Sequence, residues 1–315
     1  VTGRVLLACD DEQPLPGCGA DSSIAARITF ERPSRIPGVP NFKRSVDAIG
    51  GVGPDAEPAF EVRLPALAEG ERYDVTITPD VITGEEVVLN PAAVAPPARV
   101  TLAASSQVDD LELTIGAPNA LKRIQGRIRT EFSEPGEGVE GMQVVARGRW
   151  HEDGPLVRAS NLATTGPNGA FELLVPLAME DNFEIVARPA DATVAPTLSR
   201  AGIAFPDPPI PVAEAEPLIL EDMVVPPAPN VSPFVVTITG TSPSGEEVDV
   251  AGAQVSLVTT LTPAAGDTST VATYTAAGTT SVDGTVELPL YPGSEGKTRM
   301  YTLRVVPPPE SLSAT

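Results

Sequence analysis

The chain of 315 residues is acidic, rich in proline and glycine, and poor in aromatic residues. It carries 42 Asp and Glu against 21 Lys and Arg, a net charge of −21, so its field repels nucleic acids and anionic membrane surfaces. Its 35 Pro and 27 Gly exclude long helices, while 42% apolar residues are too many for a disordered chain. No apolar run approaches the roughly 20 residues that span a bilayer as a helix. The strong preference for arginine over lysine is typical of a GC-rich bacterial genome.

Residues 1–7 have the alternation of a β-strand from the first position, so we expect that an upstream segment has been removed. Cys9 and Cys18 follow, with eight residues between them. A metal or redox pair is one interpretation, but neither C-x-x-C spacing nor nearby histidine completes such a site. We therefore predict a disulfide that closes a loop in an oxidising, extracytoplasmic compartment. The expected location is secreted, at the cell surface, or in the periplasm or outer membrane.

Three segments of the chain repeat at the length of a domain. Their equivalent residues Phe60, Phe171 and Val286 lie 111 and 115 positions apart. An aromatic residue follows each of them after 12 to 15 residues: Tyr73, Phe183 and Tyr301. Apolar and polar residues alternate around these aromatic residues with the period of a half-buried strand.

Tight turns precede the second and third copies. Asn168-Gly169 and Asp283-Gly284 are the dipeptides that favour two-residue hairpin turns. The sequence therefore predicts a β-hairpin at each of these positions, with the repeated strand as its second arm.

Further strands recur around the repeated segment. An opening strand is predicted at residues 1–7, 123–130 and 235–241, and a second strand at 24–33, 140–150 and 251–260. A closing strand is predicted at 109–118 and 216–227. The third copy has only 14 residues after Tyr301, so its closing strand is missing. We expect that the native chain extends beyond Thr315 or that another chain supplies this strand.

Proline-rich junctions at residues 117–121 and 226–233 separate the copies, and their stiffness predicts units stacked end to end. A further proline-rich stretch, residues 205–217, is expected to be a loop or an edge segment, because proline does not donate in a central strand. The predicted units are the first repeat (1–119), the second repeat (120–230) and the incomplete third repeat (231–315).

The motifs of the second and third repeats resemble those of a known family of β-sandwich modules. The third repeat contains AGAQVSL from Ala251, TTSVDGTVEL from Thr279 and YTLRV from Tyr301. The second contains EGMQVVA from Glu140, TTGPNGAFEL from Thr164 and FEIVA from Phe183. These segments resemble the carboxypeptidase regulatory-like, or transthyretin-like, modules. The first repeat departs from the pattern, because a long loop from Val46 replaces the tight turn.

The resemblance implies an all-β protein of three tandem seven-stranded Ig-like or transthyretin-like sandwiches, the third lacking its closing strand. It implies no catalytic residues and no cofactor. Such modules usually act as spacers, docking units, or binders of glycans or proteins.

The residues also argue against an enzyme. His151 is the single histidine, and no G-x-S-x-G motif is present, so neither a histidine-dependent triad nor an α/β-hydrolase nucleophile is expected. Two acidic pairs near the closing strands are candidates for a calcium site: Asp109 with Asp110, and Glu221 with Asp222. Neither pair has EF-hand spacing, and the alternative is that all four are solvated loop residues.

The sequence favours a non-catalytic structural or interaction protein of the bacterial surface or envelope, either a rigid modular spacer or an assembly subunit. Its expected partners are other envelope or surface proteins, or further copies of itself, through an open strand edge at residues 235–240 or 301–306. The alternative is a carbohydrate-binding accessory module of a larger secreted enzyme. Trp150 and Tyr274 are then the candidate sugar platforms.

Overall fold

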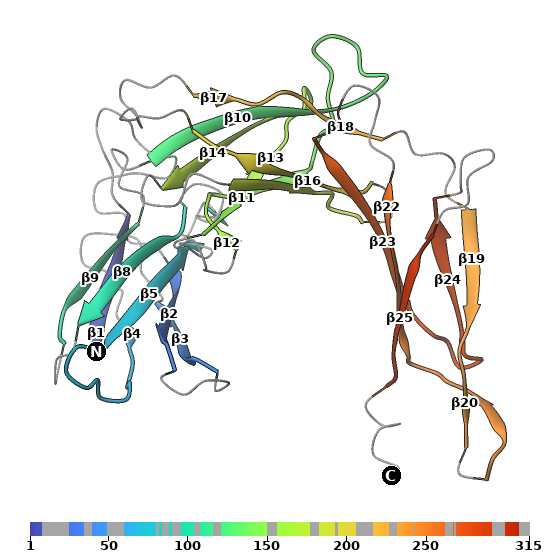
Figure 1. Ribbon diagram of the computed structural model, residues 1–315, viewed down its shortest axis with the longest axis horizontal. Helices are drawn as coiled ribbons and strands as arrows, with labels where there is room; N and C mark the ends of the chain where they lie inside the picture. The colour runs from blue at the N-terminus through green and yellow to red at the C-terminus, as the bar shows by residue number, and fades with distance from the viewer. Residues whose placement is uncertain are drawn as a thin grey trace.

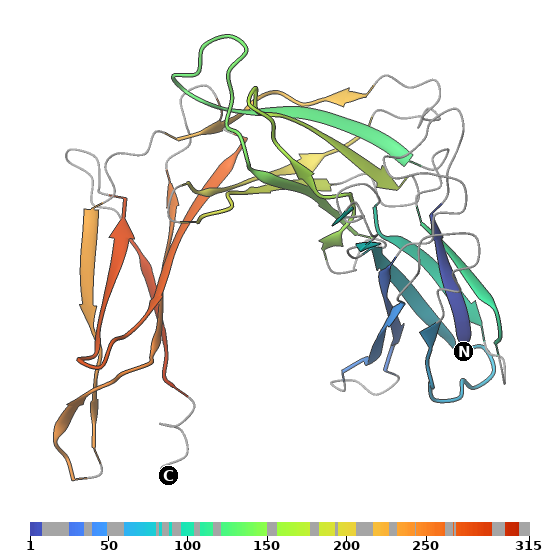
Figure 2. The ribbon, with the colours of Figure 1, turned by 180° about the vertical axis from the view of Figure 1, so that it is seen from behind.

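The chain folds into several twisted β-sheets, which we describe from a computed structural model (Figure 1). Within the described residues all regular elements are strands, as the proline and glycine content predicts. Figure 1 shows these strands in an arch, with the strands β10, β14, β16, β17 and β18, which lie between Leu121 and Val225, across its top. Figure 2 shows the same arch from behind. The structure describes residues 1–7, 25–34, 40–48, 60–79, 82–83, 88–89, 96–103, 108–115, 121–149, 156–176, 183–192, 195–205, 217–226, 232–242, 244–261, 267, 269–291 and 300–308.

The first repeat contains two facing sheets and one short strand pair. The first sheet has the order β4 (Phe60–Glu61), β1 (Thr2–Leu7), β9 (Leu111–Ile115). The second has the order β3 (Phe42–Ala48), β2 (Ala26–Arg32), β5 (Arg72–Pro79), β8 (Ala98–Ala103). The short pair is β6 (Ile82–Thr83) with β7 (Val88–Leu89). Apolar residues alternate with polar ones along these strands, so Val5, Phe30 and Val75 meet in one buried core.

The second repeat has the same plan. Its opening strand lies between an antiparallel strand and two short parallel ones: β14 (Ala170–Pro176), β10 (Leu121–Thr130), β17 (Leu218–Ile219) and β18 (Met223–Val225). The facing strands are β11 (Gln143–Gly148), β12 (Val157–Arg158), β13 (Ala163–Thr164), β15 (Phe183–Arg188) and β16 (Thr197–Ile203). The opening and closing strands predicted in these two repeats are therefore confirmed.

The third repeat shows fewer pairings. Its opening strand β19 (Ser232–Thr237) pairs antiparallel with β24 (Thr285–Leu290). The facing strands have the order β23 (Val271–Thr279), β22 (Gln254–Leu261), β25 (Thr302–Val306). A small ribbon is formed by β20 (Thr239–Thr241) and β21 (Glu247–Asp249).

Packing joins the repeats to one another. β16 pairs antiparallel with β23, with Thr197 opposite Thr273, so the facing sheets of the second and third repeats form one eight-stranded sheet. Their apolar side chains share one core, whereas the core of the first repeat takes in Leu121 and Leu174 from β10 and β14. Neighbouring repeats are therefore joined by strand pairing or by a shared apolar core, although proline-rich segments separate them in the sequence.

The predicted hairpins are not formed at Asn168-Gly169 and Asp283-Gly284. The chain does turn there, with φ of 73° at Gly169 and 69° at Gly284, which favours glycine. However, β13 before the first turn pairs with β11, while β14 after it pairs with β10. β23 and β24 likewise pair with β22 and β19. The hairpin prediction is wrong because turn residues determine the reversal of the chain, not the sheet to which each flanking strand belongs.

Candidate interaction surface

The strand edges of the third repeat differ from those of the other two. Strands β5, β15 and β25 occupy equivalent positions, since each pairs on its inner side with the second strand of its repeat. On the outer side β5 pairs antiparallel with β8, and β15 pairs antiparallel with β16. Within the described part of the chain no strand pairs with the outer side of β25. The edge predicted at residues 301–306 is thus an unpaired strand edge.

The opening strands show the same difference. In the first two repeats a parallel strand covers the outer side of the opening strand: β9 beside β1, and β17 and β18 beside β10. β19 has an antiparallel neighbour, β24, and no parallel neighbour among the residues that are described. Among the described residues, the third repeat therefore lacks two neighbouring strands that the first two repeats have, one beside β25 and one beside β19.

Core-facing side chains of β25 are more exposed than their equivalents in the strands that have a neighbour on both sides. Val75 in β5 and Ile185 in β15 are both 0% exposed, whereas the equivalent Leu303 in β25 is 50% exposed. Leu303 lies opposite the buried Leu257, so its side chain is on the core side of the sheet. Two positions further on, Val305 is 37% exposed. Core-facing apolar side chains thus remain open to solvent along β25.

The opening strand of the third repeat also has a core-facing side chain that is exposed. Phe234 in β19 lies opposite Leu288, and the equivalent Ile124 in β10 lies opposite Leu173. Ile124 is 0% exposed, whereas Phe234 is 48% exposed. The outer side of β19 with Phe234, and the outer side of β25 with Leu303 and Val305, are together called the open edge of the third repeat. Exposed apolar residues that face a core are typical of a surface that a further polypeptide covers.

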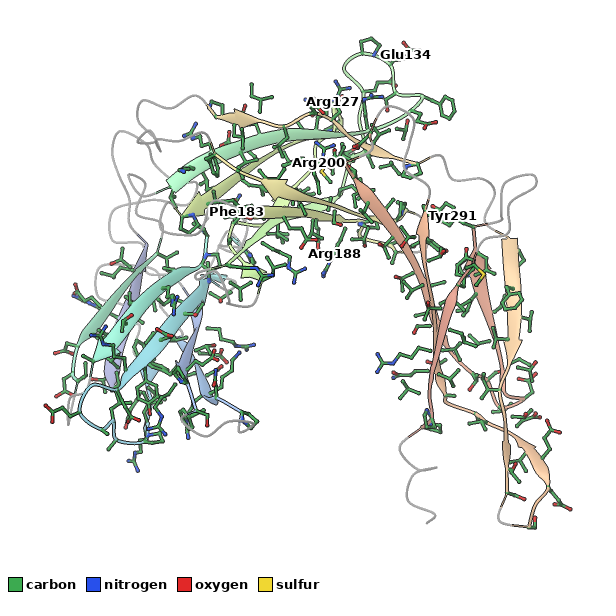
Figure 3. All side chains as sticks on the ribbon, viewed as in Figure 1. Arg127, Glu134, Phe183, Arg188, Arg200 and Tyr291 are labelled. Atoms are coloured by element: carbon green, nitrogen blue, oxygen red, sulfur yellow. The ribbon has the colours of Figure 1, made fainter. Side chains whose placement is uncertain are left out.

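A buried polar cluster around Arg200, whose position Figure 3 labels, joins the third repeat to the second. The Arg200 guanidinium donates to the backbone oxygens of Glu221 and Asp222 at 2.6 and 2.9 Å. The Asp267 carboxylate accepts from the backbone N–H of Val224 and from Thr270. Burial raises the pKa of Asp267, but these hydrogen bonds and Arg200 outweigh it and lower the pKa to about 2. The carboxylate is therefore ionised at neutral pH, and it holds the end of β18 against the third repeat.

The acidic pairs have other partners in the structure. The Asp222 carboxylate pairs with Arg129 at 2.8 Å, and the Asp109 carboxylate accepts a long hydrogen bond from Thr2. No group of three or more His, Cys, Asp or Glu side chains with metal-binding geometry occurs among the described residues. Calcium binding by Asp109, Asp110, Glu221 and Asp222 stays a prediction, while the backbones of Glu221 and Asp222 do lie at the junction of two repeats.

Tyr274 is not a sugar platform. Its side chain is 0% exposed, it packs edge-on against Tyr291, and its hydroxyl donates to the backbone oxygen of Pro289. Burial raises its pKa to about 12. The prediction of an exposed ring is wrong because Tyr274 falls on the core side of β23. Cys9, Cys18, Trp150 and His151 lie outside the described residues, so the disulfide and the Trp150 platform stay predictions.

Comparisons with known proteins add little to this description. No family model and no curated protein matches the chain, so membership of the carboxypeptidase regulatory-like family stays a prediction. A solved structure described as the Streptococcal ancillary pilin is 11% identical, covering 96% of this chain and 95% of that chain, with a TM-score of 0.26. At this TM-score the similarity carries no argument about function. No helix in the described ranges is long and apolar enough to cross a membrane.

Proposed function

We propose that this protein is a non-catalytic structural subunit of a bacterial surface or envelope assembly. It consists of three β-sandwich modules in tandem, residues 1–119, 120–230 and 231–315. It works in an extracytoplasmic compartment, where Cys9 and Cys18 form a disulfide. The proposal that it has no catalytic site rests on the sequence, which offers a single histidine and no nucleophile motif.

The open edge of the third repeat supports this role above all else. Leu303 is 50% exposed on the core side of its sheet, although both equivalent residues are fully buried. An exposed, apolar strand edge is a template on which a further strand pairs, so it supports assembly through strand pairing. The protein therefore assembles with other surface proteins through this edge.

The junctions support the second element of the proposal, a rigid spacing role. The sheet that continues from β16 into β23 and the Arg200–Asp267 pair fix the third repeat to the second. Leu121 and Leu174 pack in the core of the first repeat. A force or a contact at one repeat is thus transmitted through packed strands and not through a flexible linker.

The experiment that tests this function is chemical cross-linking on intact cells, followed by affinity recovery and mass spectrometry. Recovery of defined surface proteins linked to the chain supports an assembly subunit. Recovery of the chain unlinked to any protein and retained by polysaccharide alone would contradict it. For the carbohydrate-binding alternative, Tyr274 is no longer a candidate sugar-binding residue, because its side chain is buried.

A further inference from the structure

We propose that Asn168 is a site of spontaneous deamidation that the fold keeps closed, and that Arg127 is the side chain that holds it closed. Asn168 is exposed in the turn between β13 and β14, directly before Gly169. In a flexible chain an asparagine followed by glycine is the pair most prone to deamidate, because glycine has no side chain to obstruct the attack. This site is independent of the proposed assembly role.

The reaction is an attack of a backbone nitrogen on the preceding side chain. The Gly169 nitrogen loses its proton and bonds to Cγ of Asn168, and the side-chain amide group takes up a proton and leaves as ammonia. The resulting succinimide ring then adds one water molecule and opens to aspartate or isoaspartate. Isoaspartate inserts one carbon atom into the backbone, so it distorts the turn that carries the chain from the sheet of β11 to the sheet of β10.

The attacking nitrogen is engaged in the folded protein. The Gly169 N–H donates to the backbone oxygen of Gly166 at 2.8 Å, and the Gly169 oxygen accepts from the N–H of Ile128 at 2.9 Å. On the side-chain side, Oδ1 of Asn168 accepts from the N–H of Ala170 at 3.2 Å. Deamidation therefore requires the turn to open, so that the nitrogen and the side chain are released together.

Arg127, which Figure 3 labels, ties this turn to the neighbouring one. Its Nε donates to the backbone oxygen of Asn168 at 3.0 Å, and its Nη2 donates to the backbone oxygen of Glu137. The N–H of Gly138 donates to the oxygen of Pro167 at 3.1 Å, so the backbone also joins the two turns. Hydrogen bonds from a charged donor are stronger than neutral ones, so Arg127 raises the free energy needed to open the turn.

The third repeat contains the same closed turn, with aspartate in place of asparagine. The Gly284 N–H donates to the oxygen of Ser281 at 3.0 Å, and the Gly284 oxygen accepts from the N–H of Ile238 at 2.8 Å. The Asp283 carboxylate accepts from the hydroxyls of Ser281 and Thr285, and these hydrogen bonds lower its pKa. The bond that engages the glycine nitrogen is therefore common to both turns, whichever residue precedes the glycine.

The turn at Gly70 is a matched turn in which the glycine nitrogen is not engaged. Its φ of 80° is close to the 73° of Gly169. The hydrogen bond across this turn runs from the N–H of Glu71 to the oxygen of Ala68, and among the described residues no oxygen accepts from the Gly70 N–H. Glu69→Asn therefore creates, in an exposed turn of the same chain, a second asparagine-glycine pair without this protection.

Deamidation rates measured by peptide mass spectrometry test the proposal. The whole chain with Glu69→Asn is incubated folded in mildly alkaline buffer, and a synthetic peptide of residues 162–174 is the unfolded reference. We expect Asn168 in the folded chain to react at least about tenfold more slowly than in the peptide and than the asparagine introduced at position 69, because opening the turn breaks several hydrogen bonds. In urea, Asn168 should react at the rate of the peptide. Equal rates in the folded chain and the peptide, equal rates at the two pairs in the folded chain, or no reaction in the peptide would each overturn the proposal.

Two further variants test the role of Arg127. Arg127→Ala removes both donated hydrogen bonds and should raise the rate at Asn168 in the folded chain by about fivefold or more. Arg123→Ala removes the same side chain from the same face of β10, opposite Leu174, and should leave the rate unchanged. Circular dichroism shows whether each variant is folded, and the comparison of wild type with the peptide depends on neither. Equal rates in the two folded variants would overturn the role of Arg127.

Discussion

Arg200 and Asp267 form a buried ion pair across the junction between the second and third repeats, with 3.1 Å between Nη2 and Oδ2. Their side chains are only 6% and 4% exposed, so both charges have left water. Hydrogen bonds to backbone groups in and beside β18 offset the cost of removing these charges from water. A buried charge that loses its partner is costly, which makes this pair a sensitive point of the fold.

Asp267→Asn should destabilise the protein by about 3 kcal/mol, because it leaves the Arg200 guanidinium buried without a counter-charge. The measurement is urea unfolding at pH 7, monitored by circular dichroism. The matched control is Asp47→Asn in β3, which breaks the exposed pair with Arg27 and should cost less than about 1 kcal/mol. Equal effects of the two substitutions would contradict the role assigned to Asp267.

The same carboxylate should make stability depend on acid pH. Its pKa is lowered from 3.8 to about 2, so the native state binds this proton less readily than the unfolded chain does. The stabilisation is present above pH 4 and is lost as the pH falls from about 4 to about 2, amounting to about 2 kcal/mol. Comparing the unfolding free energies of wild type and Asp267→Asn across this range isolates the contribution. Parallel curves would show that Asp267 does not titrate in this way.

Truncation of core-facing residues should cost less in the third repeat than in the second. Ile185→Ala removes a fully buried side chain and should cost about 2–5 kcal/mol. Leu303→Ala at the equivalent position should cost only about 1 kcal/mol, because half of this side chain is already in water. Denaturant unfolding of both variants tests the comparison. A loss at Leu303 as large as the loss at Ile185 would mean that the edge is covered.

Gly169→Ala should destabilise the turn that crosses between the sheets of the second repeat. A Cβ at this position would clash with the backbone oxygen of Ile128, in addition to the strain of a positive φ. Gly70→Ala is the matched control, because its φ is 80° and no atom lies within 4 Å of the added Cβ. We expect about 1 kcal/mol for the control and about 1–3 kcal/mol more for Gly169→Ala, measured by thermal unfolding. If both substitutions lowered the stability equally, the loss at Gly169 would come from backbone strain alone and not from the clash with Ile128.

Thr165→Val should remove a buried pair of hydrogen bonds at the end of the β11–β13 pairing. The Thr165 hydroxyl donates to the oxygen of Val139 at 2.6 Å and accepts from the N–H of Met142 at 2.9 Å. Valine keeps the shape but leaves both backbone groups unpaired, at a cost of about 1–3 kcal/mol. Thr165→Ser keeps the hydroxyl and should retain most of the stability. If serine were as destabilising as valine in urea unfolding, the methyl contact and not the hydrogen bonds would matter.

The third repeat contains an equivalent threonine with the same pair of hydrogen bonds. Thr280 in the third repeat donates to Val250 and accepts from Ala253 with the same distances, 2.6 and 2.9 Å. Both threonines stand four residues before the turn glycine of their repeat. Alignment of the repeats alone shows this coincidence, but only burial shows that the hydroxyls are structural.

The strand alternation predicted the opening, second and repeated strands, because the side chains that face the core recur every two residues. It did not predict β8, β16 or β23. β8 has only partly buried apolar residues, and β16 carries Arg200 at a core-facing position. A buried arginine reads as a polar residue in sequence, and its acidic partner lies 67 positions away.

The sequence by itself determined that the chain is all-β, and it predicted strands whose pattern recurs along the chain. These properties depend on composition and on local periodicity, which each segment carries without its neighbours. Only the tertiary structure decided which strands share a sheet, how β16 continues into β23, and which apolar side chains stay exposed at the open edge. Strand pairing and burial are settled by contacts between segments far apart in the chain, so no local pattern contains them.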